Sequence, residues 1–526
     1  MTKHQKLSLL FAAIGLLCLT FAFGILLSAN AYHLLRSGKY EQSLKNARQA
    51  LPIARLVNKT WVSGLKTIVA ANTTLLSLQK IQENVDNGET PNITEFAGNL
   101  KELEVSAQAV SVNIENSKFL TRLLGSKLGK LDTAIETLTH VVPLAQYFTE
   151  GEKTLLVLLQ NSDELRATGG FMGSYALLHF NSGSLSEILV EDIYDADGQV
   201  QEYFEPPKGV AEFLSGGKGW RLPDANWNPD FALSSQDTLR FFALASRNHI
   251  DGVVAINLPV VQSLLAITGP ITLSDQDIVL SETNVDQVLR ADRDAFFAGS
   301  TAKKDIIALA TTQLKLAVAK LNTEEKKQII EQFRQQILRG NVLVYFPNQE
   351  LEKQAQALGL SGSLGPQTLQ SNTLFYYPLE SNVGINKVNA AVTREFVMTT
   401  SDTLTELGIS LHNNSTQDGY VNYQRLLFSP GQDIEQIVVN GEQVSEFDRE
   451  TVTSSTGQQY DQIGFLVTTL PNNITRIALT LTHSADFLNI LLQKQPGTAD
   501  TTLTSITQNG AKTHQLDQSF LEYMIE

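Results

Sequence analysis

The sequence predicts a chain of several domains: an N-terminal transmembrane helix with a helical stalk, a central α/β domain and a C-terminal all-β sandwich. Three observations lead to this prediction. An uncharged apolar stretch occupies residues 7–27, apolar runs of strand and helix length alternate over residues 151–348, and short alternating runs separated by turn signals begin at residue 373. These patterns are typical of a membrane-spanning helix, an α/β domain and a β-sandwich, respectively.

The composition sets the class of protein. A chain of 526 residues can hold two or three domains, each with its own core. Hydrophobic residues make up 42% and charged residues 18%, as is ordinary for a folded protein. A formal charge of −15 and the lack of a basic run argue against binding to nucleic acid. With Cys18 as the only cysteine and no paired histidine motif, disulfides within the chain and cysteine-based zinc sites are excluded.

Residues 1–30 are expected to form a short cytoplasmic tail and a membrane anchor. The apolar stretch is long enough to cross a bilayer once, and Lys3 and Lys6 precede it. A cleaved signal peptide is the alternative, because Ala29-Asn30-Ala31 resembles a cleavage site. The length of the stretch favours the anchor. We therefore expect a single-pass protein of the cell membrane, with the main chain outside the cell.

Residues 31–150 are expected to form a helical bundle or stalk. This segment is rich in Ala, Leu, Gln, Lys and Glu, and its apolar residues recur at helical spacing. Pro52 and Pro143 are expected to mark helix ends or kinks. The segment predicts three to five helices that act as a spacer.

Residues 151–360 are expected to form the α/β domain, and its first loop is the most informative stretch of the chain. The run 155–159 is apolar and ends at a polar break, which favours a buried strand. The loop that follows contains Arg166, Gly169 and Gly170. One interpretation is a structural turn in which Arg166 pairs with Asp163 or Glu164. The other is an anion site in which Arg166 and backbone N–H groups face a ligand, with the glycines allowing close approach.

A long irregular region follows between residues 195 and 229. A loop of this length inside a compact domain is usually functional or mobile. Its last part could cap the next helix, or Asn226, Trp227 and Asp230 could form the rim of a sugar site. From residue 370 to residue 526 the chain reads as the β-sandwich, with a hairpin signal at Asn440-Gly441.

Several motifs in one order resemble a known bacterial family. They are Gln160-Asn161, Glu164-Leu165-Arg166, Gly169-Gly170-Phe171, and the stretches 224–231, 250–255 and 268–271. Together they resemble the family called domain of unknown function 4012, whose name implies no activity.

The central domain also resembles, more distantly, the LytR-CpsA-Psr family of envelope glycopolymer transferases. A buried strand, Asp163, Arg166, two further strands and an acidic end at Asp192 follow that family's order. Those enzymes use Mg²⁺ and several arginines to move a glycopolymer from a polyprenyl pyrophosphate carrier to the cell wall. The resemblance implies catalytic roles for Asp163, Arg166 and Asp192, phosphate binding by Arg166, Arg290, Arg293, Lys303 and Lys304, and Mg²⁺ ligation by Asp163, Asp192 and Asp195. The candidate ligand-loop residues, Gly169, Gly170, Asn226, Trp227 and Asp230, are predicted from their own chemistry and not from this resemblance.

Two functions follow from these observations. Because the sequence is poor in arginine where that family grips phosphates, and lysine lacks the bidentate fork, we favour a non-catalytic surface module. Such a module would bind an envelope glycan or a surface protein through the long loop and the sandwich. The alternative is a Mg²⁺-dependent phosphotransferase acting on a polyprenyl-linked glycopolymer. Convergence of the predicted acidic and basic residues on one cavity with a lipid-sized slot would favour the enzyme.

Overall fold

The computed structural model describes the chain in two compact units. It places residues 3–525, except 88, 116, 117, 247, 248, 274–277 and 291–301, and it leaves out the side chains of residues 3–18, 85, 86, 115, 118–121, 123, 124, 289, 290 and 302–305. The helical unit comprises Met1–Lys153 and Phe180–Ser186, and the β-rich unit comprises Thr154–His179 and Glu187–Glu526.

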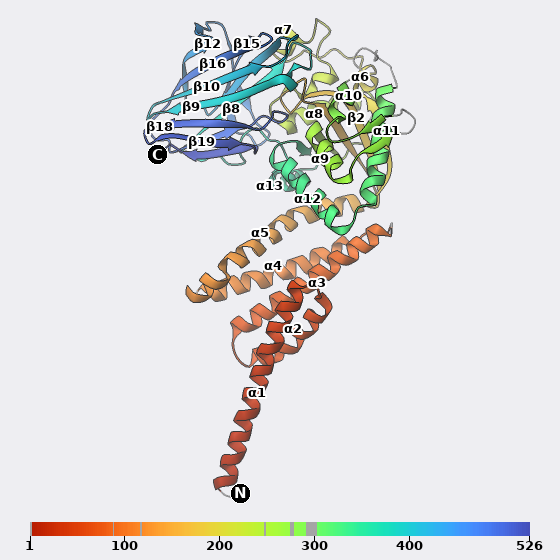
Figure 1. Ribbon diagram of the computed structural model, residues 1–526, viewed down its shortest axis with the longest axis vertical. Helices are drawn as coiled ribbons and strands as arrows, with labels where there is room; N and C mark the ends of the chain where they lie inside the picture. The colour runs from red at the N-terminus through yellow and green to blue at the C-terminus, as the bar shows by residue number, and fades with distance from the viewer. Residues whose placement is uncertain are drawn as a thin grey trace. The chain divides into compact units, whose positions relative to one another are not determined.

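The helical unit is built from the helices α1 (Lys3–Arg36), α2 (Tyr40–Arg55), α3 (Lys59–Asp86), α4 (Ile93–Glu115) and α5 (Lys118–Thr149) (Figure 1). On α2, Ala47, Ala50 and Ala54 are fully buried at helical spacing, so one small-residue face packs against α1 and α3. Pro52 and Pro143 lie inside α2 and α5. Neither proline marks a helix end.

The expected membrane anchor falls within α1. Among the residues whose side chains the structure describes, no helix is long and apolar enough to span a bilayer. Residues 7–18 of the predicted anchor lie outside those residues, and the anchor stays a prediction.

The α/β part of the β-rich unit is organised around a five-stranded sheet with the order β3-β2-β1-β4-β7. Its strands are β1 (Glu152–Asn161), β2 (Phe171–Asn181), β3 (Ser184–Asp192), β4 (Gly252–Asn257) and β7 (Val342–Tyr345). Strand β4 runs parallel to β1 and antiparallel to β7. Its helices and small hairpin are α6 (Ile193–Asp197), α7 (Val210–Phe213), η1 (Leu222–Trp227), α8 (Phe231–Leu244), α9 (Leu258–Thr268), β5 (Ile271–Leu273), β6 (Ile278–Leu280), α10 (Val285–Arg290), α11 (Ala302–Ala319), α12 (Thr323–Leu338) and α13 (Gln349–Ala357).

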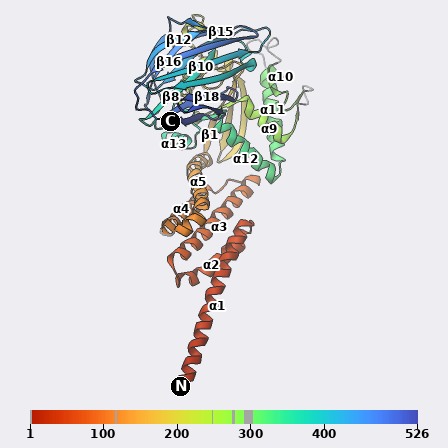
Figure 2. The same ribbon diagram turned by 60° about the vertical axis from the view of Figure 1, so that its left-hand side comes forward.

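Side chains of β1 alternate between two apolar layers, because successive strand residues point to opposite faces. Leu156 and Leu158 pack in the cluster that contains residues of α8, whereas Val157 and Leu159 pack in the cluster that contains residues of α11. The predicted buried strand at residues 155–159 is thereby confirmed. Figure 2 shows α9 and α11 next to each other, and both belong to the helical layer on one face of the sheet.

The C-terminal part is a sandwich of a seven-stranded sheet, β13-β12-β16-β10-β9-β18-β19, and a six-stranded sheet, β14-β15-β11-β8-β17-β20 (Figure 1). Apolar residues of both sheets form one core cluster. Its elements are β8 (Thr373–Asn382), η2 (Val388–Ala391), β9 (Val392–Thr400), β10 (Leu404–Asn413), β11 (Tyr420–Phe428), β12 (Asp433–Val439), β13 (Glu442–Gln443), β14 (Asp448–Thr453), β15 (Gln459–Thr469), β16 (Asn473–Thr482), β17 (Asn489–Gln493), β18 (Thr501–Thr507), β19 (Gly510–Leu516) and β20 (Phe520–Met524). The predicted multidomain chain, with helices first and a strand-rich C-terminal part, is confirmed.

Strand β8 joins the sandwich to the α/β part. All ten of its residues are buried. Tyr376 faces the sandwich core, and Phe375 and Tyr377 face a second cluster that includes Ala167 of the first loop and Leu364. The six-stranded sheet therefore has both faces covered along this strand.

Candidate functional site

Arg166 of the first loop is fully enclosed by protein. Its Nε donates to Asp224 Oδ1 and its Nη2 to Glu164 Oε1, each at 3.0 Å, and its Nη1 donates to the carbonyl of Asn382 at 2.8 Å. Burial disfavours the charged guanidinium, but the carboxylates of Asp224 and Glu164 outweigh this effect, so the pKa of Arg166 lies above its ordinary value. The predicted ion pair with Glu164 is confirmed, and Arg166 connects the first loop to β8 through its hydrogen bond to Asn382.

The glycines of the loop make room for other parts of the protein. A Cβ on Gly170 would lie 2.3 Å from the carbonyl carbon of Asn161. Gly169 has a φ of +133°, and a Cβ on it would lie 2.6 Å from Gln160 Oε1 and 2.7 Å from Asn257 Oδ1. A Cβ on Gly497 of the sandwich would lie 1.9 Å from the carbonyl oxygen of Gly169. Close packing of backbone and amide side chains requires glycine here.

The other residues of the predicted ligand loop are buried as well. Asn226 Nδ2 donates to the carbonyl of Gly170 at 2.8 Å. Trp227 is stacked on Tyr423 with ring centroids 5.9 Å apart, and the guanidinium of Arg425 lies 4.6 Å from the centre of its ring. Trp227 is only 5% exposed, so neither face is open to a sugar.

Asp230 caps helix α8, as the sequence predicts. Its Oδ1 accepts hydrogen bonds from the backbone N–H groups of Ala232 and Leu233. Its Oδ2 accepts from the N–H of Leu364 at 3.1 Å and from the N–H of Ser455 at 3.0 Å. This carboxylate therefore also connects the α/β part to the sandwich.

The remaining predicted residues are distributed over three helices. Asp192 caps α6 by accepting from the N–H of Tyr194 at 2.9 Å, and Asp195 is exposed in the same helix. Arg290 ends α10, and Lys303 and Lys304 belong to the first turn of α11; their side chains, and Arg293 as a whole, lie outside the described residues. Among the described residues, no three His, Cys, Asp or Glu side chains form a group that could hold a metal ion.

A cavity of about 450 Å³ lies between the sheet and the layer formed by α9, β5, β6, α10 and α11. Its wall is mostly aliphatic. The lining residues are Leu159, Gln160, Asn161, Asp163, Ser174, Ile256, Asn257, Leu258, Val261, Leu264, Leu265, Ile271, Leu280, Val285, Asp286, Ile307, Ala310, Thr311, Leu314, Lys315 and Val318. This volume falls within the usual range of ligand sites, roughly 300–1,000 Å³.

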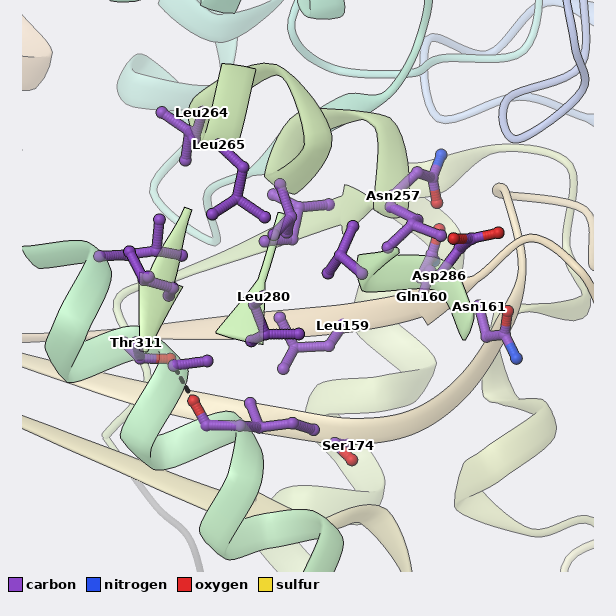
Figure 3. A pocket seen from close by; sticks show the side chains of 18 of the residues that line it. Leu159, Gln160, Asn161, Ser174, Asn257, Leu264, Leu265, Leu280, Asp286 and Thr311 are labelled. Atoms are coloured by element: carbon purple, nitrogen blue, oxygen red, sulfur yellow. Dashed lines mark hydrogen bonds between the residues drawn. The ribbon is translucent and has the colours of Figure 1, made fainter. Parts of the chain in front are cut away.

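Several polar groups of the cavity lie near one another, and others lie elsewhere in its wall. Figure 3 shows Gln160, Asn257 and Asp286 close together and away from Leu264 and Leu265, whereas Ser174 and Thr311 lie apart from them. Gln160 and Asn257 are 4% and 2% exposed, and Gln160 Oε1 and Asn257 Oδ1 have no hydrogen-bond partner among the described residues. A mostly aliphatic cavity with hydrogen-bonding groups gathered in one part of it is suited to an amphiphile.

Sequence reasoning missed Gln160 and Asn257 as site residues, although a signal was present. Each follows an apolar strand run, and the two residues are paired in the parallel register of β1 and β4. The carboxyl ends of parallel strands meet at one edge of a sheet, where ligands commonly bind. Of the predicted site residues with described side chains, Asp163 lines the cavity, whereas Arg166, Asp192 and Asp195 do not. Gly169 adjoins the two free amide oxygens.

The fold defines the class of protein only broadly: an α/β domain that contains an apolar cavity is joined to a β-sandwich. Residues 150–293 match the family described as "Protein of unknown function (DUF4012)". The match supports, for this segment, the resemblance drawn from the first-loop motifs.

Two solved structures show local similarity. A "putative nutrient binding protein" from Legionella pneumophila is 12% identical, with 22% of this chain and 49% of that chain covered and a TM-score of 0.17, so the chain spans about half the length of that protein. The Lin1025 protein from Listeria innocua is 15% identical, with 40% and 78% covered and a TM-score of 0.23. No curated protein matches the chain. None of these matches shows the LytR-CpsA-Psr resemblance.

Proposed function

We propose that this protein binds amphiphilic ligands without transforming them, and that it holds the apolar chain of the ligand in the cavity beside α9 and α11. The observation that carries the proposal is the cavity itself: it has a volume of about 450 Å³, its wall is mostly aliphatic, and Gln160, Asn257 and Asp286 lie together in one part of it. Transfer of each methylene from water into such a chamber contributes about 0.8 kcal/mol. Several buried methylenes therefore offset part of the free-energy cost of the translational and rotational entropy lost on binding.

The position of Arg166 supports binding rather than catalysis. A phosphotransferase needs cationic donors directed at the phosphates, but the guanidinium of Arg166 donates to Glu164, Asp224 and Asn382. Polyprenyl phosphotransfer with Mg²⁺ held by Asp163, Asp192 or Asp195 remains the alternative prediction, and preferential binding of a phosphate ligand would favour it.

The other predicted ligands receive less support from the geometry. A glycan bound on the long loop would need an exposed aromatic face, and Trp227 is buried against Tyr423. A glycan or protein bound by the sandwich, and a place at the outer face of the cell membrane, stay predictions.

The test uses the full chain held in an amphipathic polymer with no free detergent, because detergents are themselves amphiphiles. Every variant is prepared in the same way, so that probe taken up by the polymer or by the apolar stretch 7–27 is the same in each. Binding of the neutral probe N-phenyl-1-naphthylamine is followed by fluorescence. Ala310→Trp places an indole in the cavity from α11, whereas Thr312→Trp adds the same group at an exposed position of that helix outside the cavity lining. We expect the first variant to bind the probe at least about tenfold more weakly, a loss of about 1.4 kcal/mol. Equal affinity of Ala310→Trp and Thr312→Trp would refute cavity binding.

A further inference from the structure

We infer that the head group bound at the polar end of the cavity is a neutral hydrogen-bond donor, such as the hydroxyl groups of a glycerol monoester, rather than a phosphate. This inference rests on the proposed function, because it concerns the same cavity. Two buried amide oxygens without partners carry it.

Asn257 lines the cavity, and its amide oxygen is the free end of the side chain because its nitrogen is engaged elsewhere. Asn341 Nδ2 donates to Gln336 Oε1 at 2.8 Å, which leaves Asn341 Oδ1 to accept from Asn257 Nδ2 at 3.5 Å. The direction of this chain orients Asn257 Oδ1 away from Asn341. That oxygen is buried and has no partner in the described part of the structure.

The amide of Gln160 follows the same pattern. Its Nε2 donates to the hydroxyl oxygen of Thr168 at 2.8 Å, and the same hydroxyl accepts from Asn226 Nδ2 at 3.1 Å. Gln160 Oε1 is left without a partner among the residues described. A Cβ on Gly169 would lie within 2.7 Å of both free oxygens, so the two acceptors are close to each other on the side of the cavity next to Gly169. A buried acceptor without a donor is costly, and a ligand that supplies the donor removes this cost.

The charges around the cavity disfavour an anionic head. Two carboxylates, Asp163 and Asp286, line it, whereas the one lining cation among the described side chains is Lys315, which is exposed. A phosphate would approach two acceptor oxygens and two carboxylates, and like charges in a partly buried site repel strongly. Hydroxyl groups can donate to the two free amide oxygens and bring no charge to the site.

The experiment compares three ligands with the same lauryl chain in competition with the fluorescent probe: 1-monolauroylglycerol, methyl laurate and dodecyl phosphate. We expect the glycerol ester to bind at least about tenfold more tightly than methyl laurate, which has no donor, and dodecyl phosphate to bind most weakly. Equal affinity of the glycerol ester and methyl laurate would overturn the head-group inference and leave the proposed function intact. Tightest binding of dodecyl phosphate would also overturn it and would favour the phosphotransferase. Failure of all three ligands and of the probe to bind would refute both proposals.

Two variants assign any preference to the amide. Asn257→Leu removes one free oxygen and keeps a side chain of similar size, so the preference for the glycerol ester over methyl laurate should fall about tenfold. Thr311→Val is the matched control, because it changes a cavity residue whose hydroxyl already donates to the carbonyl of Ile307 at 2.8 Å (Figure 3). An unchanged preference in Asn257→Leu would contradict the assignment. The ligand series on the unsubstituted protein tests the inference even if that variant fails to fold.

Discussion

Replacing Arg166 by methionine tests whether this residue holds the β-rich unit together. The substitution keeps much of the side-chain length but removes the donors to Glu164, Asp224 and Asn382. The Glu164 and Asp224 side chains, 8% and 18% exposed, would then share a largely buried site without a cation. Breaking a buried pair by removing one partner costs about 3–5 kcal/mol. We expect a loss of that size in the free energy of unfolding, measured by urea denaturation and tryptophan fluorescence.

Two comparisons make this prediction refutable. Arg240→Met removes an exposed arginine whose guanidinium lies 4.2 Å from the centre of the Phe204 ring, and it should cost about 1 kcal/mol or less. Adding Glu164→Gln and Asp224→Asn to Arg166→Met should recover part of the lost stability, because the unpaired charges are gone. The reasoning is wrong if Arg166→Met unfolds at the same urea concentration as Arg240→Met. A folded Arg166→Met variant that loses only phosphate binding would instead support the phosphate-site prediction.

Two further predictions concern other buried positions. Burial raises the pKa of Glu352 to about 7, so the folded chain binds more protons than the unfolded chain and stability falls as the pH rises from about 4.5 to 7. Glu352→Gln keeps an acceptor for the N–H of Phe346, and its free energy of unfolding should rise by up to about 3 kcal/mol at pH 8 and by almost nothing at pH 4. An equal gain at both pH values in urea titrations would contradict this cause. Gly497→Ala should lower the free energy of unfolding more than Gly431→Ala, because both glycines have positive φ but only Gly497 lies against a neighbouring carbonyl. The backbone strain, which both variants share, is about 1–2 kcal/mol. Equal unfolding midpoints for the two variants would exclude the clash at Gly497.

The parts of the fold that the sequence predicts are those set by local patterns. The run 155–159 is a strand because its length and its polar end are local properties, and Asp230 caps α8 because a short acceptor precedes an apolar helix. Strand β8 lacks such a signal. Both of its faces are covered, so its residues show no alternation of polar and apolar types, and Pro378 lies within it.

The candidate site depends on contacts that sequence spacing does not encode. Arg166 pairs with Glu164 nearby, but Asp224 and Asn382 are 58 and 216 positions further along the chain. The cavity arises where side chains of β1, β4, α9 and α11 leave space between packed layers. Its volume follows from how these side chains fit together, and hydrophobic periodicity only says which of them face inward.

The contact with the sandwich and the polar end of the cavity belong to one continuous stretch of chain. Two hydrogen bonds connect the sandwich to the first loop. Arg166 Nη1 donates to the carbonyl of Asn382, and Gln495 Nε2 donates to the carbonyl of Arg166 at 3.0 Å. Two residues further on, the hydroxyl of Thr168 fixes the amide of Gln160. Since that amide is half of the acceptor pair, we expect the sandwich to stabilise the geometry proposed to select the head group, even though none of its residues lines the cavity. Loosening the sandwich contact should therefore weaken discrimination between head groups before it weakens binding of the apolar chain.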